Sequence, residues 1–468
     1  MLWVMPSCDI LLEEPDHIIV TDGFYKSERD AIAAVNSIYN RLAARMYNRG
    51  MQVMADLSVD DHKNGQGMPN PFLLDLEFLR VTPENQFVSQ TWQDHYDGIN
   101  RANTAINRIP DIEMNANLKN RLLGEASFIR GLLYFNLVRF FGEIPIVTSD
   151  TRNLSDLNLE RAPVTEVYQL IIQDLEFAAS NLPKINAGND LGRATEGAAK
   201  ILLGKVYLTM EDWGSCIEVL EEVITQEGAY GYGLYQDFRD NWNRSTENGA
   251  EMVFSVQYNE PPGIPNSMMR LSAPRNRVPG LIGNEADIPT QEVYDIFDAE
   301  DLRRDATFYT SYEQDGITYE FPFPFFYKYF DPDRTHATNQ SNANVYVLRY
   351  SDALLMLAEA VNESTGPNTL AYESINRVRR RAYGNNDYDL SNLSQTEFRD
   401  AVHLERRKEF VFEGQRWFDL VRTGKFYETM LNHTENGGNN VQPFHELMPI
   451  PQREMDTNPN LVQNEGYN

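Results

Sequence analysis

A row of carboxylates and arginines near the C-terminus has the residue types of a catalytic pair. Glu405, Glu409 and Glu413 repeat every four residues, with Arg406 and Arg416 nearby. Two carboxylates that flank a glycosidic bond are the acid and base of glycoside hydrolases. An i, i+4 repeat, however, places its members side by side on one helix, whereas a glycosidase pair faces itself across the substrate. Alternating charges on a helix are typical of ion pairs, so we interpret the row as structural and keep a glycoside hydrolase as the less favoured alternative.

Other catalytic patterns are missing from the sequence. The seven histidines include no H-E-x-x-H spacing, and the chain contains neither a G-x-S-x-G motif nor a P-loop. We therefore predict that the protein is not an enzyme and needs no cofactor. A structural calcium ion could bind carboxylate oxygens at Asp331-Pro332-Asp333, or at Asp56 with Asp60 and Asp61. We interpret both sets as turns or solvated acidic loops.

The two cysteines stand in different contexts. Cys216 lies at the start of an amphipathic pattern and is expected to be a small buried residue. Cys8 follows Ser7 and an apolar stretch, as at the cleavage site of a bacterial lipoprotein signal peptide. Residues 1–7 would then be a residual signal peptide and residues 8–25 a lipid-linked tether. The basic start is missing, which indicates a misassigned start codon or a truncated sequence, and an ordinary N-terminal cysteine is the alternative.

The overall charge is strongly acidic. The chain has 468 residues, 42% of them hydrophobic and 24% charged, with a formal net charge of −28. These fractions of hydrophobic and charged residues are typical of a globular protein. The excess of acidic residues repels phosphate backbones, which excludes nucleic acid as a partner. No run of about 18 apolar residues occurs, so we expect contact with a membrane through a lipid anchor only.

Over most of the chain, the sequence predicts helices, and these helices would position the residues described above. Apolar residues recur with helical spacing, for example over residues 85–109. The string Leu203-Gly204-Lys205-Val206-Tyr207 fits the L-G-x-x-Y core of a tetratricopeptide repeat, in which the glycine lets a paired helix approach closely. Looser copies begin at Leu123 and Leu354. We predict a mainly α fold, a tetratricopeptide-like helical-repeat scaffold whose N-terminal region spans residues 26–228.

Residues 229–345 interrupt the helical periodicity. Glycine, proline, asparagine and aromatic residues accumulate there, and the alternating run Met252-Val253-Phe254-Ser255-Val256 predicts a short strand. Long irregular stretches inside a folded chain usually carry function, so we predict a loop-rich, partly β insertion on the ligand-binding face. Helical periodicity resumes at Tyr346. Residues 346–468 are expected to form a C-terminal helical region with a surface-wrapping tail, within one compact unit.

Several motifs occur in a characteristic order along nearly the whole chain. The stretch of residues 96–103, YDGINRAN, fits the pattern Y-x-x-I-x-x-A-N. Further stretches of this kind are residues 125–135 with 141–145, residues 348–360, residues 405–422 and residues 449–461. Together with Cys8 and the acidic residues after it, they resemble the SusD/RagB family of outer-membrane nutrient-binding lipoproteins from Bacteroidetes.

The resemblance implies a role at the cell surface. Members of this family lie as lids over a SusC-like TonB-dependent transporter, capture oligosaccharides or sometimes peptides, and deliver them for import. It therefore implies a glycan-binding lipoprotein, anchored in the outer membrane and surface-exposed, with a SusC-like transporter and an oligosaccharide as partners. A helical-repeat scaffold for protein or peptide partners is the alternative.

A glycan site needs two kinds of side chain. Flat aromatic rings stack on the C–H face of a sugar, and planar amides, carboxylates or guanidinium groups bond to paired hydroxyls. The polar loop of residues 60–66 and the irregular insertion supply both kinds. The expected ligand-binding residues are Asp61, His62, Asn64, Trp242, Tyr258, Arg275, Asn276, Tyr309, Tyr312 and Tyr319. We predict that the site joins the first loop to some of the residues in the insertion.

Overall fold

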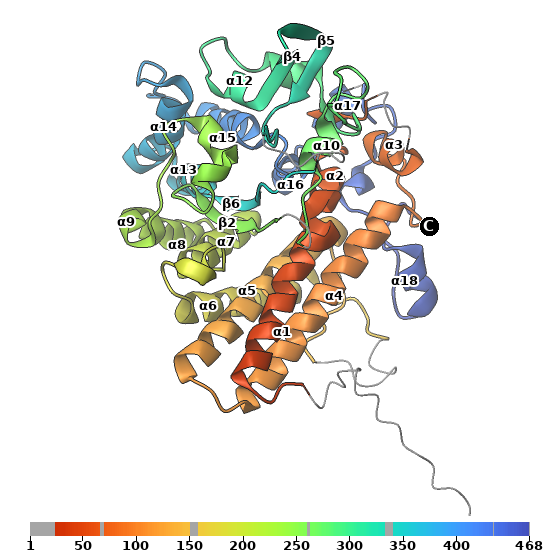
Figure 1. Ribbon diagram of the computed structural model, residues 1–468, viewed down its shortest axis with the longest axis vertical. Helices are drawn as coiled ribbons and strands as arrows, with labels where there is room; N and C mark the ends of the chain where they lie inside the picture. The colour runs from red at the N-terminus through yellow and green to blue at the C-terminus, as the bar shows by residue number, and fades with distance from the viewer. Residues whose placement is uncertain are drawn as a thin grey trace, which may run out of the picture.

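The computed structural model describes residues 24–65, 70–149, 158–259, 263–332, 340–433 and 435–467. Most of these residues are helical, so the predicted mainly α fold is confirmed (Figure 1). The long helices pack each on the next in chain order: α4 (Gln86–Arg108), α5 (Ala116–Phe141), α6 (Val164–Asn181), α7 (Glu196–Thr209) and α8 (Trp213–Thr225). The stack continues from α8 to α13 (Tyr350–Thr365), which also contacts α14 (Thr369–Tyr383) and α15 (Gln395–Phe410).

The first helix lies across the N-terminal end of this stack. Helix α1 (Glu28–Arg41) packs on α4 and α5, and it continues through a π-helical segment (Leu42–Gly50) into α2 (Met51–Asp56). Ser27 caps α1, and the Asp30 side chain accepts the backbone N–H of Ser27 in return, which satisfies free donors at the helix start. This helix brings the polar loop that follows α2 towards the opposite end of the molecule (Figure 1).

Glycines allow the helices to pack closely. A Cβ atom at Gly204 would lie 2.6 Å from Leu220 Cδ2 on the next helix, and one at Gly131 would lie 3.2 Å from Leu175 Cδ2. The close approach expected at the glycine of the L-G-x-x-Y string is therefore present between α7 and α8.

Among the described residues, three two-stranded antiparallel sheets lie in or beside the insertion: β1 (His62–Lys63) with β3 (Ile288–Pro289), β2 (Met252–Val256) with β6 (Val345–Arg349), and β4 (Phe308–Gln314) with β5 (Ile317–Phe326). The strand predicted at residues 252–256 is confirmed. The helix expected from Tyr346 is wrong at its start, because residues 345–349 pair with β2 and helix α13 begins at Tyr350.

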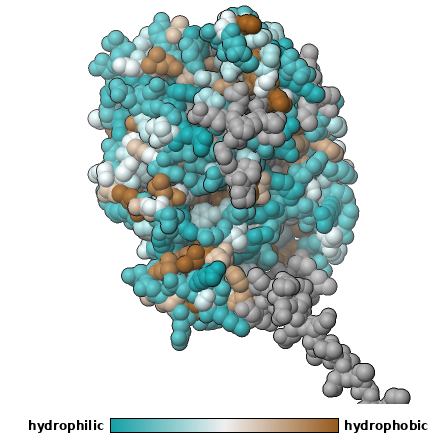
Figure 2. Space-filling view, viewed as in Figure 1, coloured by the Kyte–Doolittle hydropathy of each residue, from teal (hydrophilic) through white to brown (hydrophobic). Residues whose placement is uncertain are grey.

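Shorter helices complete the described chain. They are α3 (Pro71–Glu77), α9 (Glu227–Tyr230), α10 (Met268–Ser272), α11 (Gln291–Asp295), α12 (Arg303–Thr307), α16 (Arg416–Arg422), α17 (Phe426–Asn432) and α18 (Gln452–Thr457). The main hydrophobic core runs through the helical stack, and a second, smaller cluster lies under the β4–β5 hairpin. The face in Figure 2 is mostly hydrophilic, with hydrophobic residues in small separate groups.

The carboxylates at the end of α15 and just after it form buried ion pairs. Glu409 contacts the guanidinium groups of Arg303, Arg349 and Arg381. Glu413, which lies in the turn after α15, contacts the guanidinium of Arg349 and the ammonium of Lys328. All of these side chains are buried. The interpretation of the Glu405–Glu413 row as structural agrees with these contacts.

Candidate functional site

An open cavity of about 800 Å³ lies between the loop of residues 270–284 and strand β5. We name it the arginine–tyrosine pocket, and its polar lining comes from Arg270, Arg275, Asn276, Arg277, Asn284 and Tyr319. Three of these, Arg275, Asn276 and Tyr319, belong to the predicted ligand-binding set. The structure therefore brings together residues that lie more than 40 positions apart in the sequence.

The 270–284 loop is held in shape by its own backbone and by one buried carboxylate. Asn276 adopts a left-handed backbone conformation with φ of 57°. A Cβ at Gly283 would overlap the carbonyl oxygen of Ala273, so only glycine fits where the loop folds back on itself. Glu285 accepts the backbone N–H of Arg275 at 2.9 Å and the Nε–H of Arg277 at 2.6 Å. These bonds leave the side chains of Arg275 and Asn276 exposed at the rim.

The opposite wall is the β4–β5 hairpin. Asp315 and Gly316 form its two-residue turn, both with positive φ, as an Asp-Gly turn requires. The register pairs Tyr312 with Tyr319, and both rings are half-buried against the second hydrophobic cluster. Tyr312 packs on Phe330 with ring centroids 5.6 Å apart. The hairpin thus presents tyrosine faces beside the arginines of the loop.

Three of the predicted aromatic residues are buried instead. Trp242 is 7% exposed and packs against Phe238, Tyr329 and Tyr346 in the main core. Tyr258 is also 7% exposed and belongs to the same core. Tyr309 lies in the second cluster, under the hairpin. Buried rings cannot stack on a ligand, so we leave these three out of the proposed ligand contacts.

The first loop reaches the insertion, and its predicted ligand residues are buried or half-buried there. His62 and Lys63 pair with Pro289 and Ile288 as strands β1 and β3. Asp61 and His62 are buried, and the Asn64 amide donates to the carbonyl of Ala286 at 3.2 Å. Asp61 and His62 are therefore also left out of the ligand contacts, whereas half-buried Asn64 supports the segment that follows the pocket loop.

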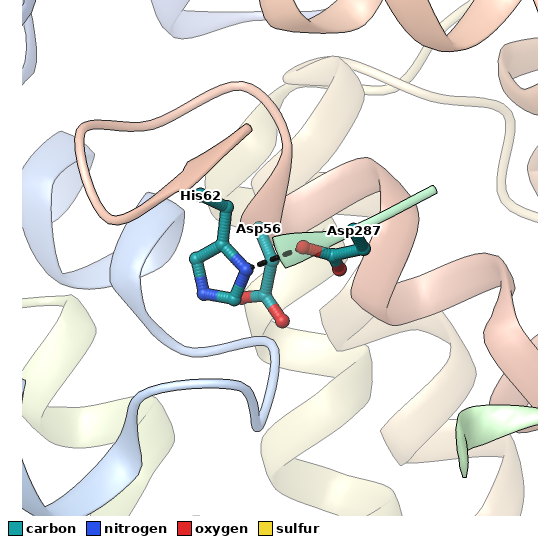
Figure 3. A group of neighbouring side chains, drawn as sticks. All are labelled: Asp56, His62 and Asp287. Carbon is teal, nitrogen blue, oxygen red and sulfur yellow. Dashed lines mark hydrogen bonds and ion pairs between the residues drawn. The ribbon is translucent and has the colours of Figure 1, made fainter. Parts of the chain in front are cut away.

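Asp56, His62 and Asp287 form a compact buried group (Figure 3). His62 Nδ1 lies 2.7 Å from Asp287 Oδ1. Burial lowers the pKa of His62, but the charges of Asp287 and Asp56 raise it more, to about 9. Burial raises the pKa of the Asp56 carboxyl to about 8. A protonated His62 that donates its Nδ1–H to Asp287 accounts for the short contact.

The same group could hold a metal ion. One potential ligand atom from each of Asp56, His62 and Asp287 lies within 4.8 Å of the other two. His62 Nδ1 and Asp287 Oδ1 already satisfy each other, and a proton on His62 neutralises part of the acidic charge. The buried atoms Asp56 Oδ1, His62 Nε2 and Asp287 Oδ2 have no hydrogen-bond partner among the described residues. The Nδ1–Oδ1 contact joins the first loop to the insertion.

The acidic loop expected to be solvated is buried. Arg416 donates to both carboxylate oxygens of Asp60, and Arg407 donates to Asp61 at 2.7 Å. The interpretation as a turn is right for Asp60 and Asp61. The interpretation as a solvated loop is wrong, because two arginines from the C-terminal region neutralise these carboxylates away from water. Asp331 is buried as well and accepts the Ser341 hydroxyl, while Asp333 lies outside the described residues.

Sequence reasoning missed Arg270, Arg277 and Asn284. A signal for them exists, because Arg270, Arg275 and Arg277 fall within eight residues of a strongly acidic chain. A comparison of the charge of each short segment with the average charge of the chain would have singled out this segment.

Two further expectations concern the termini and cysteines. Cys8 lies outside the described residues, so its lipidation stays a prediction. Cys216 is buried, as expected. Within the described parts of the chain, no helix combines the length and the apolar character that crossing a membrane requires.

A helical-repeat scaffold with a polar and aromatic pocket on inserted loops defines a class of binding proteins. Residues 24–208 match a family model described as "Starch-binding associating with outer membrane", and residues 309–467 match the model of the SusD family. The chain belongs to the SusD/RagB family. The pocket loop of residues 270–284 lies between the two matched regions.

Relatives and solved structures agree with this assignment. A SusD-like protein from Formosa agariphila is 27% identical over 514 residues, which cover 100% of this chain and 98% of the relative. A laminarin-binding SusD-like protein of known structure is 28% identical, with a TM-score of 0.82 and coverage of 95% of this chain and 100% of that one. A surface glycan-binding protein A from Bacteroides fluxus is 25% identical, with a TM-score of 0.80 and coverage of 94% and 100%.

Proposed function

We propose that this protein is a cell-surface lipoprotein that binds an oligosaccharide and passes it to a SusC-like TonB-dependent transporter in the outer membrane. One observation carries the binding part of this proposal. The arginine–tyrosine pocket places the ring of Tyr319 beside Arg275 and Asn276 at an open cavity of about 800 Å³.

The chemistry of the pocket suits a sugar. A tyrosine ring can stack on the apolar C–H face of a pyranose, and Tyr312 extends the aromatic wall across the hairpin. The guanidinium of Arg275 and the amide of Asn276 carry fixed planar donors that match vicinal hydroxyl groups. A cavity of this size accommodates a short oligosaccharide segment.

The relatives support a glycan as the ligand. One structural neighbour is named for laminarin binding and another as a surface glycan-binding protein. The description of the matching N-terminal family model includes starch binding and association with the outer membrane. Export and lipid anchoring rest on Cys8 and its context in the sequence.

Binding without hydrolysis fits the placement of the acidic residues. Glu405, Glu409 and Glu413 are engaged with buried cations and do not line the pocket. No Asp or Glu is found among the described residues that line the pocket. A pair of carboxylates for glycoside hydrolysis is therefore missing from that lining.

The binding proposal is tested by substituting Tyr319. We expect Tyr319→Ala to weaken the affinity for the best oligosaccharide of a screening panel by on the order of tenfold, because a stacking face is lost. Isothermal titration calorimetry on the soluble protein measures this, with neutral and acidic oligosaccharides and with peptides as probes.

Thr318→Ala is the matched control, because alternate residues of a strand point to opposite faces of the hairpin. The control should bind like the wild type. Unchanged affinity in Tyr319→Ala would remove the pocket from the proposal, and binding of peptides alone would favour the scaffold alternative. Co-purification of a TonB-dependent transporter from outer membranes tests the partner.

A further inference from the structure

The arginine–tyrosine pocket is basic in an acidic protein. Arg270, Arg275 and Arg277 line it, whereas the chain as a whole carries a formal net charge of −28. A cluster of arginines is unusual on so acidic a protein, because most patches of its surface are expected to be acidic.

One of the three arginines is neutralised and the other two are not. Arg277 pairs with Glu285 at 2.6 Å, and its guanidinium lies over the Phe323 ring at 5.1 Å. Within the described residues, Arg270 and Arg275 form no ion pair, and the backbone of Arg275, not its side chain, bonds to Glu285. The pocket therefore carries roughly two uncompensated positive charges.

Arg270 lacks a full set of partners. It is half-buried, and its Nε–H has no hydrogen-bond acceptor although the atom is buried. A second cation is close by: burial, followed by the charges of Arg270 and Arg45, lowers the pKa of Arg49. A buried guanidinium donor without an acceptor is unfavourable, and an anionic group in the cavity that Arg270 lines would stabilise the charge of this guanidinium.

We propose that the arginine–tyrosine pocket binds an acidic oligosaccharide, in which Arg270 and Arg275 contact carboxylate or sulfate groups and Tyr319 stacks on a sugar ring. This inference rests on the proposed function and specifies its ligand class. Guanidinium groups match carboxylate and sulfate oxygens through paired N–H donors, which hydroxyl groups match less well. Arg277, held by Glu285, positions the loop.

Three probes of similar length test the ligand class by calorimetry: an oligogalacturonide with carboxylates, a carrageenan oligosaccharide with sulfate esters, and a neutral laminarin oligosaccharide. We expect at least one acidic probe to bind about tenfold more tightly than the neutral one at low salt, as charged hydrogen bonds contribute. The affinity for that probe should fall as NaCl rises from roughly 50 to 500 mM, because salt screens exposed charges. The better of the two acidic probes shows which of these two acidic glycans the pocket prefers.

Variants locate the effect. Arg275→Gln, at an exposed position, should lose about tenfold in affinity for the acidic probe and clearly less for the neutral probe, because glutamine still donates to hydroxyl groups but carries no charge. Arg29→Gln is the matched control, since Arg29 is exposed on α1, far from the hairpin (Figure 1). Arg270→Gln is a second variant, with circular dichroism to confirm its fold.

The outcomes separate the two proposals. Tighter or equal binding of the neutral probe, or an unchanged acidic preference in Arg275→Gln, would overturn this inference and leave glycan binding intact. Failure of all three probes, together with every other oligosaccharide of the screening panel, to bind would overturn both. A preference for acidic probes cannot come from the bulk charge of the protein, which repels them.

Discussion

At the scale of single residues, the contact between His62 and Asp287 links two segments more than 200 positions apart. His62 is the first residue of β1, and Asp287 lies between the pocket loop and β3, immediately before the strand. The ion pair therefore helps to fix the base of the loop that carries Arg275 and Asn276. Its strength depends on a proton on His62, which gives the fold a dependence on pH.

The sign of this dependence follows from the pKa values. The pKa of His62 is about 9 in the folded protein, whereas the ordinary value for histidine is 6.5. The contribution of His62 to stability is therefore fully present below pH 6.5 and is lost as the pH rises through 9. The raised pKa of Asp56 acts in the same direction. We expect the free energy of unfolding, measured with urea, to fall by up to ~3 kcal/mol from pH 6.5 to 9.5 through His62.

The substitution His62→Gln should flatten this part of the profile. His95→Gln is the matched control, because burial lowers the pKa of His95 to about 4 and keeps it neutral across the whole window. The control should keep the slope of the wild type. An identical slope in His62→Gln and the wild type would show that the ion pair does not depend on the proton.

At the scale of elements, the helical stack depends on small residues where two helices meet. Helices α7 and α8 approach at Gly204, whose missing side chain leaves room for Leu220. The distance between α7 and α8 also affects the position of α13, because α8 packs in turn on α13. A larger residue at Gly204 would therefore separate elements on both sides of the insertion.

We expect Gly204→Val to lower the free energy of unfolding by about 2 kcal/mol, since the new methyl groups would overlap the buried Leu220. Gly228→Val, on the short helix α9, is the control because a Cβ there meets nothing within 4 Å, and its effect should stay within about 0.5 kcal/mol. Urea unfolding followed by circular dichroism measures both. Equal effects of the two substitutions would contradict the close-packing role.

At the scale of the whole molecule, buried ion pairs connect the insertion to the C-terminal helices. Glu409 of α15 meets Arg303 of α12, Arg349 of β6 and Arg381 of α14. Buried charges are tolerated only when each keeps its partners. The network therefore makes the position of the insertion depend on the scaffold.

We expect Glu409→Gln to destabilise the protein by about 3–5 kcal/mol, because three buried guanidinium groups lose a shared carboxylate. Glu373→Gln, which removes an exposed partner of Arg380, should cost less than ~1 kcal/mol. Chemical denaturation compares the two variants. A small effect at Glu409 would mean that water or a neighbouring carboxylate compensates the arginines.

Local patterns predicted the scaffold well. Helical spacing, the L-G-x-x-Y string and the strand at residues 252–256 all depend on neighbours close in the chain. Residues 345–349 were misjudged because their strand exists only through pairing with β2, about 95 positions earlier. The order and the number of the motifs were sufficient to identify the family from the sequence.

Only part of the predicted ligand-binding set lies at the proposed site, for a physical reason. Residue type shows that a tyrosine can stack, but burial decides whether it is free to do so. Arg275, Asn276, Tyr312 and Tyr319 remain at or beside the pocket, whereas Trp242, Tyr258 and Tyr309 are enclosed by aromatic neighbours from distant segments. No local pattern separates these two groups.

The second hydrophobic cluster has a consequence for how such proteins diversify. The hairpin and the pocket loop share this small cluster, which is separate from the core of the helical stack. Substitutions in the pocket therefore change few contacts of the main core, and the loop lies between the regions that match the family models. A lineage could exchange the preferred sugar, from neutral to acidic or back, while inheriting the same scaffold.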